Sequence, residues 1–148
     1  MAGIDESKPF VSINIAVLTV SDTRTAANDT SGDVLVGRVE AKGHRVYDRK
    51  ILPDDQAELR KQLTEWCANS DIDVVITTGG TGVTGRDVTV EAHRALYEKE
   101  IPGFGELFRW ISYQKIGTST VQSRATAGVC QGTYMFALPG STDRKSVV

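Results

Sequence analysis

Residues 74–87 read Val74-Val75-Ile76-Thr77-Thr78-Gly79-Gly80-Thr81-Gly82-Val83-Thr84-Gly85-Arg86-Asp87. Three β-branched apolar residues lead into a segment with four glycines and four threonines. Apolar residues at helical spacing follow at once, namely Val88, Ala92, Ala95 and Leu96. The pattern predicts a strand, a tight loop and a helix, and open α/β sheets bind ligands where strands pass into such loops. Because the helix would direct unpaired N–H groups at the loop, we expect a phosphate-bearing ligand there.

This glycine loop, residues 79–87, comes close to two phosphate-binding motifs. Residues 80–85 match G-x-G-x-x-G, but that motif follows the first strand of its unit, whereas this loop follows the third expected strand. The motif G-x-x-x-x-G-K-[ST] needs a lysine and a hydroxyl where the chain has Arg86 and Asp87. Since a carboxylate repels phosphate unless a cation lies between them, Asp87 predicts a bound Mg²⁺. The alternative is that Asp87 or Thr89 caps the following helix.

Composition and charge limit the class of protein. The 148 residues suit one domain, expected at residues 12–148 after a flexible leader at residues 1–11. The net charge of −2 and the pI near 5.7 argue against a protein that binds nucleic acid or a membrane surface. No apolar run reaches the length of a membrane span, and Cys67 and Cys130 lie in apolar patterns. We therefore expect buried, reduced cysteines in a cytoplasmic protein.

Strands and helices are expected to alternate along the chain. Besides the strand before the glycine loop, β-rich segments cover residues 12–20, 44–52 and 133–138. Helical patterns cover residues 33–42, 53–67, 88–100 and 104–115. The alternation predicts a three-layer α/β domain with a mostly parallel sheet and helices on both faces.

The last predicted helix carries aromatic residues on two sides. Its inner face is expected to consist of Phe104, Leu107, Phe108 and Ile111, with Lys115 at its end. Trp110 and Tyr113 would point away from that face. Exposed aromatic residues of this kind favour contact with another subunit, so we expect a homo-oligomer.

Two neighbouring aspartates follow the second expected strand. Asp55 and Glu58 have the spacing of a capping box, so Asp55 is expected to cap the start of a helix. Asp54 has no such structural role in the sequence pattern. Together with Asp87, Asp54 would place two carboxylates from different loops in one crevice. Such a set suits phosphoryl or nucleotidyl transfer, in which catalysis is mostly positioning and charge neutralisation. The alternative is a solvated turn carboxylate at Asp54.

Two more polar segments are candidates for the same crevice. Ser21, Asp22 and the group Asp29-Thr30-Ser31-Gly32 follow the first expected strand. Gln122-Ser123-Arg124 would offer an arginine and hydroxyl groups to an anionic ligand. The alternative for residues 21–32 is an ordinary polar connection in which Thr30 or Ser31 caps the next helix.

Seven motifs, in this order, resemble the MoaB/MogA family of molybdenum-cofactor biosynthesis, which includes the G domains of fused proteins such as gephyrin. They are Leu18-Thr19-Val20-Ser21-Asp22, Asp29-Thr30-Ser31-Gly32, Pro53-Asp54-Asp55, Thr78-Gly79-Gly80-Thr81-Gly82 with Arg86-Asp87-Val88-Thr89, Pro102-Gly103-Phe104-Gly105-Glu106, Ser123-Arg124 and Leu138-Pro139-Gly140-Ser141. The amino-acid sequence at residues 116–120 and 139–142 is more similar to the MoaB branch than to MogA.

The resemblance implies a Rossmann-like molybdopterin-binding fold, assembled as trimers or hexamers. Active members are adenylyltransferases, in which the terminal phosphate of molybdopterin attacks the α-phosphate of Mg-ATP and releases pyrophosphate. Asp54 and Asp87 match the two aspartates required for activity. Asp87 is expected at the Mg²⁺, and Asp54 either at the Mg²⁺ or as the residue that orients the attacking phosphate. Matched substrate-binding residues are Ser21, Asp22, Thr78, Gly79, Gly80, Thr81, Gly82, Arg86, Ser123, Pro139, Gly140 and Ser141.

One alternative function remains within the resemblance. Some bacterial MoaB proteins lack one or both of these aspartates and have no assigned catalytic role. A non-catalytic molybdopterin-binding carrier or scaffold of the same pathway is therefore the alternative to the enzyme.

Overall fold

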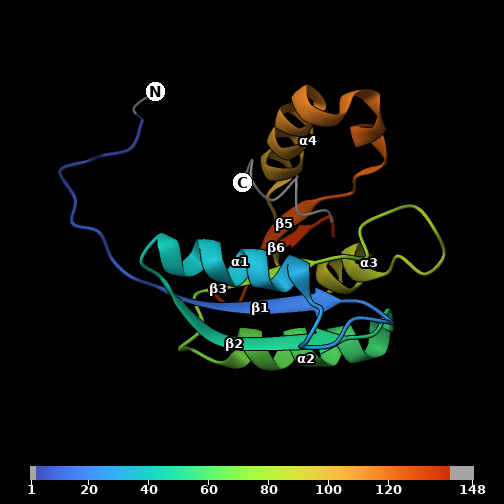
Figure 1. Ribbon diagram of the computed structural model, residues 1–148. Coiled ribbons are helices and arrows are strands. Elements are labelled where there is room, and N and C mark those ends of the chain that lie inside the picture. Colours follow the sequence, from blue (N-terminus) through green and yellow to red (C-terminus); the bar gives the residue numbers. More distant parts are fainter. Residues whose placement is uncertain (1–2, 141–148) are drawn as a thin grey trace.

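A six-stranded sheet with helices on both faces forms the computed structural model, which describes residues 3–140 (Figure 1). The expected α/β fold class is confirmed. The strands are β1 (Asn14–Val20), β2 (Arg45–Leu52), β3 (Val74–Thr78), β4 (Lys99–Glu100), β5 (Thr126–Cys130) and β6 (Thr133–Leu138). The helices are α1 (Thr30–Ala41), α2 (Gln56–Ala68), α3 (Thr89–Arg94) and α4 (Pro102–Ile116), followed by the 3-10 helix η1 (Gly117–Gln122).

The strand order β2-β1-β3-β6-β5-β4 places four parallel strands side by side. β1 pairs in parallel with β2 and β3, and β3 pairs in parallel with β6, whereas β5 runs antiparallel to both of its neighbours. The register sets Thr78 of β3 between Thr19 of β1 and Leu138 of β6, and Val20 opposite Leu52 of β2. The loops after these four strands therefore begin at one edge of the sheet.

The sheet separates two hydrophobic clusters. Helices α1 and α4 cover one face, and α2 and α3 cover the other (Figure 1). The first cluster joins β1 to α1 and α4 through Ile15, Val17, Leu35, Val39 and Phe108. The second joins the opposite face of the sheet to α2 and α3 through Leu18, Val75, Leu59, Leu63, Trp66 and Ala92. The three layers hold the sheet rigid below its loop edge.

His93 fastens α3 to β3 inside the core. Its side chain is buried, with Nε2 2.8 Å from Oγ1 of Thr77 and Nδ1 3.2 Å from the hydroxyl of Tyr97. Burial lowers the pKa of His93 to about 3, so the imidazole is neutral. Because Thr77 precedes the glycine loop and His93 follows it, the contact between them fixes how far apart the two ends of the loop lie.

Helix α1 begins earlier than the sequence pattern predicted. Its first residue is Thr30, not Asp33, and the N-cap is Asp29 instead of Thr30 or Ser31. The Asp29 carboxylate accepts the N–H of Gly32 at 3.0 Å, so the polar residues after it form the first helical turn.

Helix α3 is shorter than predicted. It ends at Arg94, whereas the pattern of apolar residues pointed to a helix as far as Glu100. Lys99 and Glu100 instead form the edge strand β4, opposite Val129 and Gly128 of β5. Pairing with a strand that is distant in the sequence overrides the local helical pattern here.

On the predicted inner face of α4, the expected burial is confirmed for Phe108 and is wrong for Leu107. Phe108 is buried, but 55% of Leu107 is exposed. Only a narrow stripe of α4 is fully buried, formed by Gly105, Phe108 and Ser112, and Leu107 lies beside this stripe. Trp110 and Tyr113 point outward as predicted, with 65% and 57% of each residue exposed.

Cys67 and Cys130 are buried and free, as predicted. Burial, together with the neighbouring Cys130, raises the pKa of the Cys67 thiol to about 12, so it stays protonated at neutral pH. Both cysteines therefore act as small apolar core residues.

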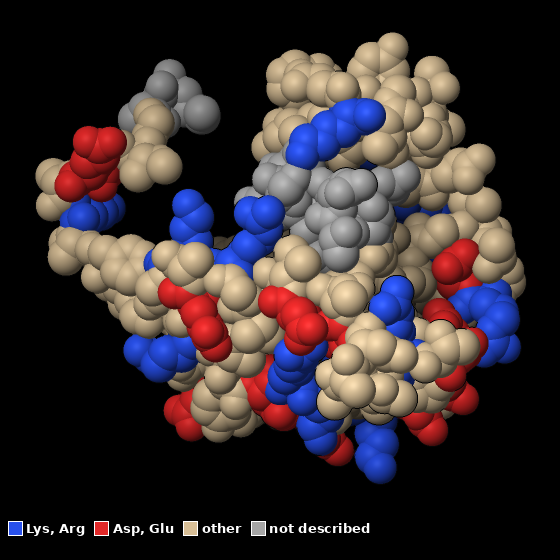
Figure 2. Space-filling model, viewed as in Figure 1, with Lys and Arg blue, Asp and Glu red and all other residues tan. Residues whose placement is uncertain are grey.

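Charged side chains of both signs are mixed on the surface. On the face shown in Figure 2, Lys and Arg alternate with Asp and Glu around α1 and β2. Within residues 3–140, no helix is both long and apolar enough to span a membrane.

Candidate functional site

Four loops meet at the carboxyl edge of the parallel strands. Asp22, after β1, accepts the backbone N–H of Asp54, after β2, at 3.0 Å. Gly79, at the start of the glycine loop, donates its N–H to Leu138 O at 2.9 Å, and the Thr78 hydroxyl donates to Pro139 O at 3.2 Å. The structure thus brings together segments that the sequence assigned to one crevice, and Thr78 serves there as a buried link between β3 and β6.

The backbone of the glycine loop has a conformation that only glycine adopts readily. Gly79 and Gly80 have φ angles of 97° and 69°, in the left-handed region. Gly80 lies so close to Thr89 that a Cβ would be 2.2 Å from its hydroxyl oxygen, which itself donates to Gly79 O at 2.7 Å. Within residues 3–140, the N–H groups of Gly80 and Thr81 have no hydrogen-bond partner. They are available to an anion.

Two adjoining cavities lie at this edge, and Gly79 and Gly140 line both. The larger, of about 340 Å³, lies against the glycine loop and is lined by Gly79, Gly80, Thr81, Gly82, Asp87, Ser119, Gln122, Ser123, Pro139 and Gly140. The smaller, of about 190 Å³, lies against the loop after β1 and is lined by Thr19, Val20, Ser21, Arg24, Asp29, Ser31, Thr78, Gly79 and Gly140.

Ser123 lines the larger cavity and carries a buried hydroxyl group. The residue is 5% exposed, and its Oγ makes no hydrogen bond within the part of the chain that the structure describes. A buried hydroxyl without a partner is costly, so a ligand oxygen that accepted its proton would be bound more tightly. Ser119 and Gln122 of η1 also line this cavity. Gln122 belongs to the predicted segment 122–124, whereas Ser119 was not predicted, since no spacing in the sequence links it to the glycine loop.

Asp54 lies against the glycine loop. A Cβ on Gly80 would be 3.2 Å from its Oδ1. Burial raises the pKa of Asp54, and so do the nearby carboxylates of Asp22 and Asp87, although the Arg86 charge opposes this. Among the described residues, none donates a hydrogen bond to the Asp54 carboxylate. The Asp54 carboxylate therefore lies near two other carboxylates without a hydrogen-bond donor of its own among residues 3–140.

Asp87 lies on the same loop with its carboxylate held by hydrogen bonds. Its Oδ2 accepts the N–H of Thr84 at 2.9 Å and the Thr84 hydroxyl at 2.7 Å. Burial opposes ionisation of Asp87, but the hydrogen bonds from Thr84 and from the N–H of Gly82 outweigh it, and the pKa lies below its usual range. Asp87 is thus a fixed negative charge beside the cavity, and it is not the helix cap considered for it, since α3 begins after Val88.

Asp22 and Arg86 bind each other across the crevice. Nε and Nη2 of Arg86 both donate to Oδ2 of Asp22. The hydrogen bond from the Asp54 N–H lowers the pKa of Asp22 most, and the hydrogen bond from Arg86 lowers it further. In this structure the two predicted ligand-binding residues join neighbouring loops.

The sequence matches the family described as "Probable molybdopterin binding domain" over residues 16–148. The chain belongs to this MoaB/MogA family. It is 46% identical to "Molybdenum cofactor biosynthesis protein B" of Escherichia coli K12 over 136 residues, which are 92% of this chain and 80% of the relative. The protein of the same name from Bacillus subtilis is 44% identical over 88% of this chain and 77% of its own length.

Solved structures of the MoaB/MogA family have the same fold. A crystal structure of Molybdenum cofactor biosynthesis protein B superposes with a TM-score of 0.91 at 41% identity, covering 95% of this chain and 88% of the other. The tungsten cofactor synthesizing protein MoaB from Pyrococcus furiosus gives a TM-score of 0.81 at 40% identity, covering 91% and 86%. The described part of the chain thus has the MoaB/MogA architecture.

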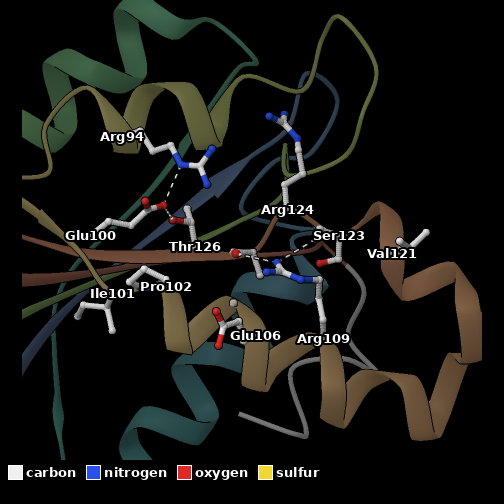
Figure 3. Close-up of a pocket in the computed structure, with 12 residues that line it drawn as sticks. Arg94, Glu100, Ile101, Pro102, Glu106, Arg109, Val121, Ser123, Arg124 and Thr126 are labelled. Carbon is white, nitrogen blue, oxygen red and sulfur yellow. Dashed lines mark hydrogen bonds and ion pairs between the residues drawn. The ribbon is translucent and has the colours of Figure 1, made fainter.

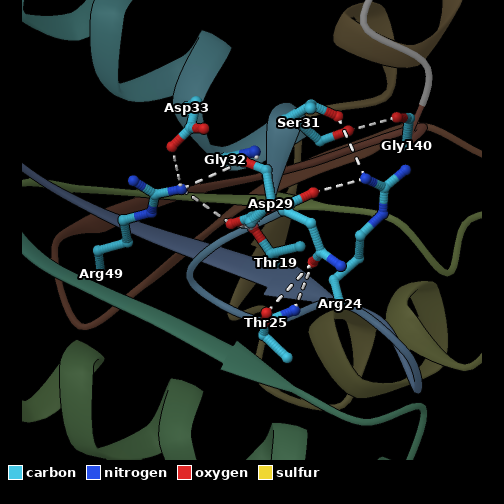
Figure 4. A network of polar contacts seen from close by, with 11 residues as sticks. Thr19, Arg24, Thr25, Asp29, Ser31, Gly32, Asp33, Arg49 and Gly140 are labelled. Carbon is cyan, nitrogen blue, oxygen red and sulfur yellow. Dashed lines mark hydrogen bonds and ion pairs between the residues drawn. The ribbon is translucent and has the colours of Figure 1, made fainter.

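The loop after β1 is largely built around a buried carboxylate in this MoaB/MogA chain. Asp29 is fully buried and accepts hydrogen bonds from the Thr19 hydroxyl at 2.8 Å and from Arg49 at 3.0 Å (Figure 4). Arg49 also pairs with Asp33 at 2.7 Å. Asp29 therefore caps α1 and holds it against the sheet. Ser21 has a local role as well, because its Oγ accepts the N–H of Arg24 at 3.1 Å.

The residues present fit a Mg²⁺ ion with few protein ligands. Mg²⁺ in nucleotide sites commonly binds one or two carboxylates and completes its coordination with water and phosphate oxygens. Asp54, with no hydrogen-bond donor to its carboxylate among residues 3–140, and Asp87, with a lowered pKa, lie against one loop. No group of three or more His, Cys, Asp or Glu side chains able to hold a metal occurs in the same residues. A Mg²⁺ ion held by Asp54 and Asp87 would take its other ligands from water or from the phosphate oxygens of a ligand.

Asp55 has the capping role that the sequence predicted for this MoaB/MogA chain. Its carboxylate accepts the N–H of Glu58 at 3.0 Å, at the start of α2. We expect Asp55→Ala to lower the free energy of unfolding by ~1 kcal/mol through the lost cap, with little change in any activity of the crevice. Urea denaturation measures the first effect. A folded Asp55→Ala protein without activity would show that the catalytic aspartate has been wrongly assigned.

Ser141 was predicted to bind substrate together with Pro139 and Gly140. Gly140 lines both cavities and accepts a hydrogen bond from the Ser31 hydroxyl at 2.5 Å, and Pro139 lines the larger one. Ser141 lies outside the described residues.

Proposed function

We propose that this chain is a molybdopterin adenylyltransferase. A terminal phosphate oxygen of molybdopterin attacks the α-phosphorus of Mg-ATP, the new P–O bond forms, and the bond from the α-phosphorus to the oxygen bridging the β-phosphorus breaks. The products are adenylyl-molybdopterin and pyrophosphate. The observation that carries this proposal is the position of the Asp54 carboxylate beside Gly80 and of the Asp87 carboxylate beside Gly82, in a glycine loop whose Gly80 and Thr81 N–H groups have no partner among residues 3–140.

The comparisons support the choice of substrate. The matching family is described as molybdopterin binding, and the relatives are named for molybdenum cofactor biosynthesis. The larger cavity is lined by the residues of both backbone N–H groups and by Ser123, whose hydroxyl has no partner within the described residues, and these donors suit a phosphorylated ligand.

The reaction assigns a role to each part of the crevice. The N–H groups of Gly80 and Thr81 and the Ser123 hydroxyl donate to phosphate oxygens and orient them. Asp87 would hold Mg²⁺, and Asp54 would hold it too or orient the attacking phosphate. When bound there, Mg²⁺ neutralises charge on the phosphate oxygens. Because catalysis of this kind is mostly positioning, the rigid sheet edge below the loops is itself part of the mechanism.

A second candidate, a molybdopterin-binding carrier or scaffold, is favoured by one observation. The Asp87 carboxylate is already bound by Thr84, and Arg86, the only arginine within the glycine loop, is paired with Asp22. A site that only binds the pterin phosphate would need no further movement of these groups.

Product analysis separates the two candidates. The protein is mixed with molybdopterin, ATP and Mg²⁺, and the small molecules are identified by mass spectrometry. The enzyme produces adenylyl-molybdopterin in amounts exceeding the protein. Tight binding of molybdopterin by titration calorimetry, without that product, would reject the enzyme and favour the carrier.

We also propose that the chain assembles as a homo-oligomer, trimer or hexamer, through the exposed face of α4. Leu107, Trp110 and Tyr113 form an apolar surface there, of the kind that another subunit covers. Light scattering at micromolar concentration is expected to give three or six times the mass of one chain. A particle of 16.1 kDa would contradict the assembly.

A further inference from the structure

Arg124 closes the base of the glycine loop. Its Nε donates to Gly82 O at 2.7 Å, and its Nη2 donates to Asp87 O at 3.1 Å. The backbone N–H of Arg124 donates to Thr81 O at 3.1 Å. One residue thus binds the loop on both sides of its exposed tip, residues 83–86.

Glu91 of α3 holds the guanidinium in place. Its two carboxylate oxygens accept from Nη1 of Arg124 at 2.6 Å and from Nη2 at 3.0 Å. The hydrogen bond from Arg124 lowers the pKa of Glu91. Paired N–H donors on a carboxylate fix the plane of the guanidinium, and so they fix its contacts with the loop.

The guanidinium has little capacity left for a ligand. Arginine has five N–H donors, and Arg124 uses four of them on Gly82, Asp87 and Glu91. In Figure 3, Arg124 extends away from Arg109 and toward the glycine loop. Most of its donors are bound within the protein, which favours a positioning role over the role of anion ligand considered for it from the sequence.

We propose that Arg124, held by Glu91, is a positioning residue that sets the place of the Asp87 carboxylate. This inference rests on the proposed function, in which Asp87 holds Mg²⁺. The Asp87 carboxylate is bound to Thr84 in the tip, and the Asp87 carbonyl is bound to Arg124 at the base. The tip and the carboxylate are thus one unit anchored by the guanidinium. Lysine cannot replace it, because one ammonium group cannot reach two carbonyls and a carboxylate in a fixed plane.

Hydrogen exchange tests the anchoring without reference to catalysis. Arg124→Gln is expected to speed exchange of the Thr84 and Asp87 amides by about tenfold or more, since among residues 3–140 each amide bonds only to the other residue, within the loop that Arg124 anchors. Amides of β1 and β3 should be unchanged. Arg94→Gln is the matched control, because Arg94 also pairs with a glutamate, Glu100, at 2.9 Å, but away from the loop (Figure 3).

Activity supplies a second, independent measurement. Arg124→Gln is expected to lower kcat by ~10- to 10²-fold and to raise the Mg²⁺ concentration for half-maximal rate, with KM for ATP within about twofold. Arg124→Lys should recover less than a tenth of the lost rate, and Arg94→Gln should behave like wild type.

The outcomes separate this inference from the proposed function. Unchanged exchange at Thr84 and Asp87 in a folded Arg124→Gln protein would overturn the inference. The inference would also be overturned if Arg124→Gln only raised KM for ATP, since Arg124 would then bind phosphate directly. If the wild type makes no adenylyl-molybdopterin, the enzyme proposal fails, and the exchange data still decide whether Arg124 anchors the loop.

Discussion

Replacing Asp87 with asparagine is expected to lower molybdopterin-dependent turnover by ~10²-fold or more while the protein stays folded. Asparagine keeps an oxygen that can accept from the N–H and hydroxyl of Thr84, so the turn that these bonds form is retained. It removes the negative charge, which the hydrogen bonds of the turn favour in the wild type. The loss should therefore appear in kcat and in the Mg²⁺ requirement.

Asp71→Asn is the control for this change. Asp71 lies just before β3, at the other end of the sheet from the crevice, and its substitution removes the same charge. The circular dichroism melting curves of both variants should match that of the wild type. Wild-type turnover by Asp87→Asn would remove Asp87 from the catalytic machinery.

Replacing Gly79 with alanine is expected to lower the free energy of unfolding by at least ~3 kcal/mol. The φ angle of 97° disfavours any residue with a Cβ, which costs ~1–2 kcal/mol. In addition, the Cβ would be 2.5 Å from Val20 O, a backbone atom of the interior strand β1 that cannot move aside cheaply. Urea denaturation with an unchanged m-value measures the loss.

Gly85→Ala provides the matched comparison within the same loop. No atom lies within 4 Å of a Cβ at Gly85, and its φ is not in the left-handed region. Its effect on the unfolding free energy should lie within ~0.5 kcal/mol of zero. If the two alanine variants were equally stable, the close contact between the glycine loop and β1 would not exist as described.

Much of the fold follows from local patterns in the sequence. The strand at residues 133–138 and the start of the strand at Val74 coincide with the structure, because β-branched or aromatic residues there are bounded by clear turn residues. The capping pattern also distinguished Asp55 from Asp54. The spacing between Asp55 and Glu58 identifies Asp55 as the helix cap, so Asp54 remained the candidate for the crevice. In these cases the local sequence alone determines the structure, because the residue types and their spacing have only one physical explanation.

The errors occur where distant parts of the chain decide the outcome. The stretch after Arg94 is helical in pattern, but β5 pairs with Lys99 and Glu100 and makes them a strand. The exposure of Leu107 depends on how narrowly α4 contacts the sheet, which its own sequence does not encode. In the crevice, the pairing of Arg86 with Asp22 depends on residues brought together only by folding. No local pattern predicts it.

Pyrophosphate release from ATP and Mg²⁺, measured with and without purified molybdopterin, tests the central proposal most directly. The wild type should release pyrophosphate only when molybdopterin is present. Asp87→Asn should release almost none, and Asp71→Asn should release as much as the wild type. Tight molybdopterin binding without any release by the wild type would contradict the adenylyltransferase and leave a binding protein.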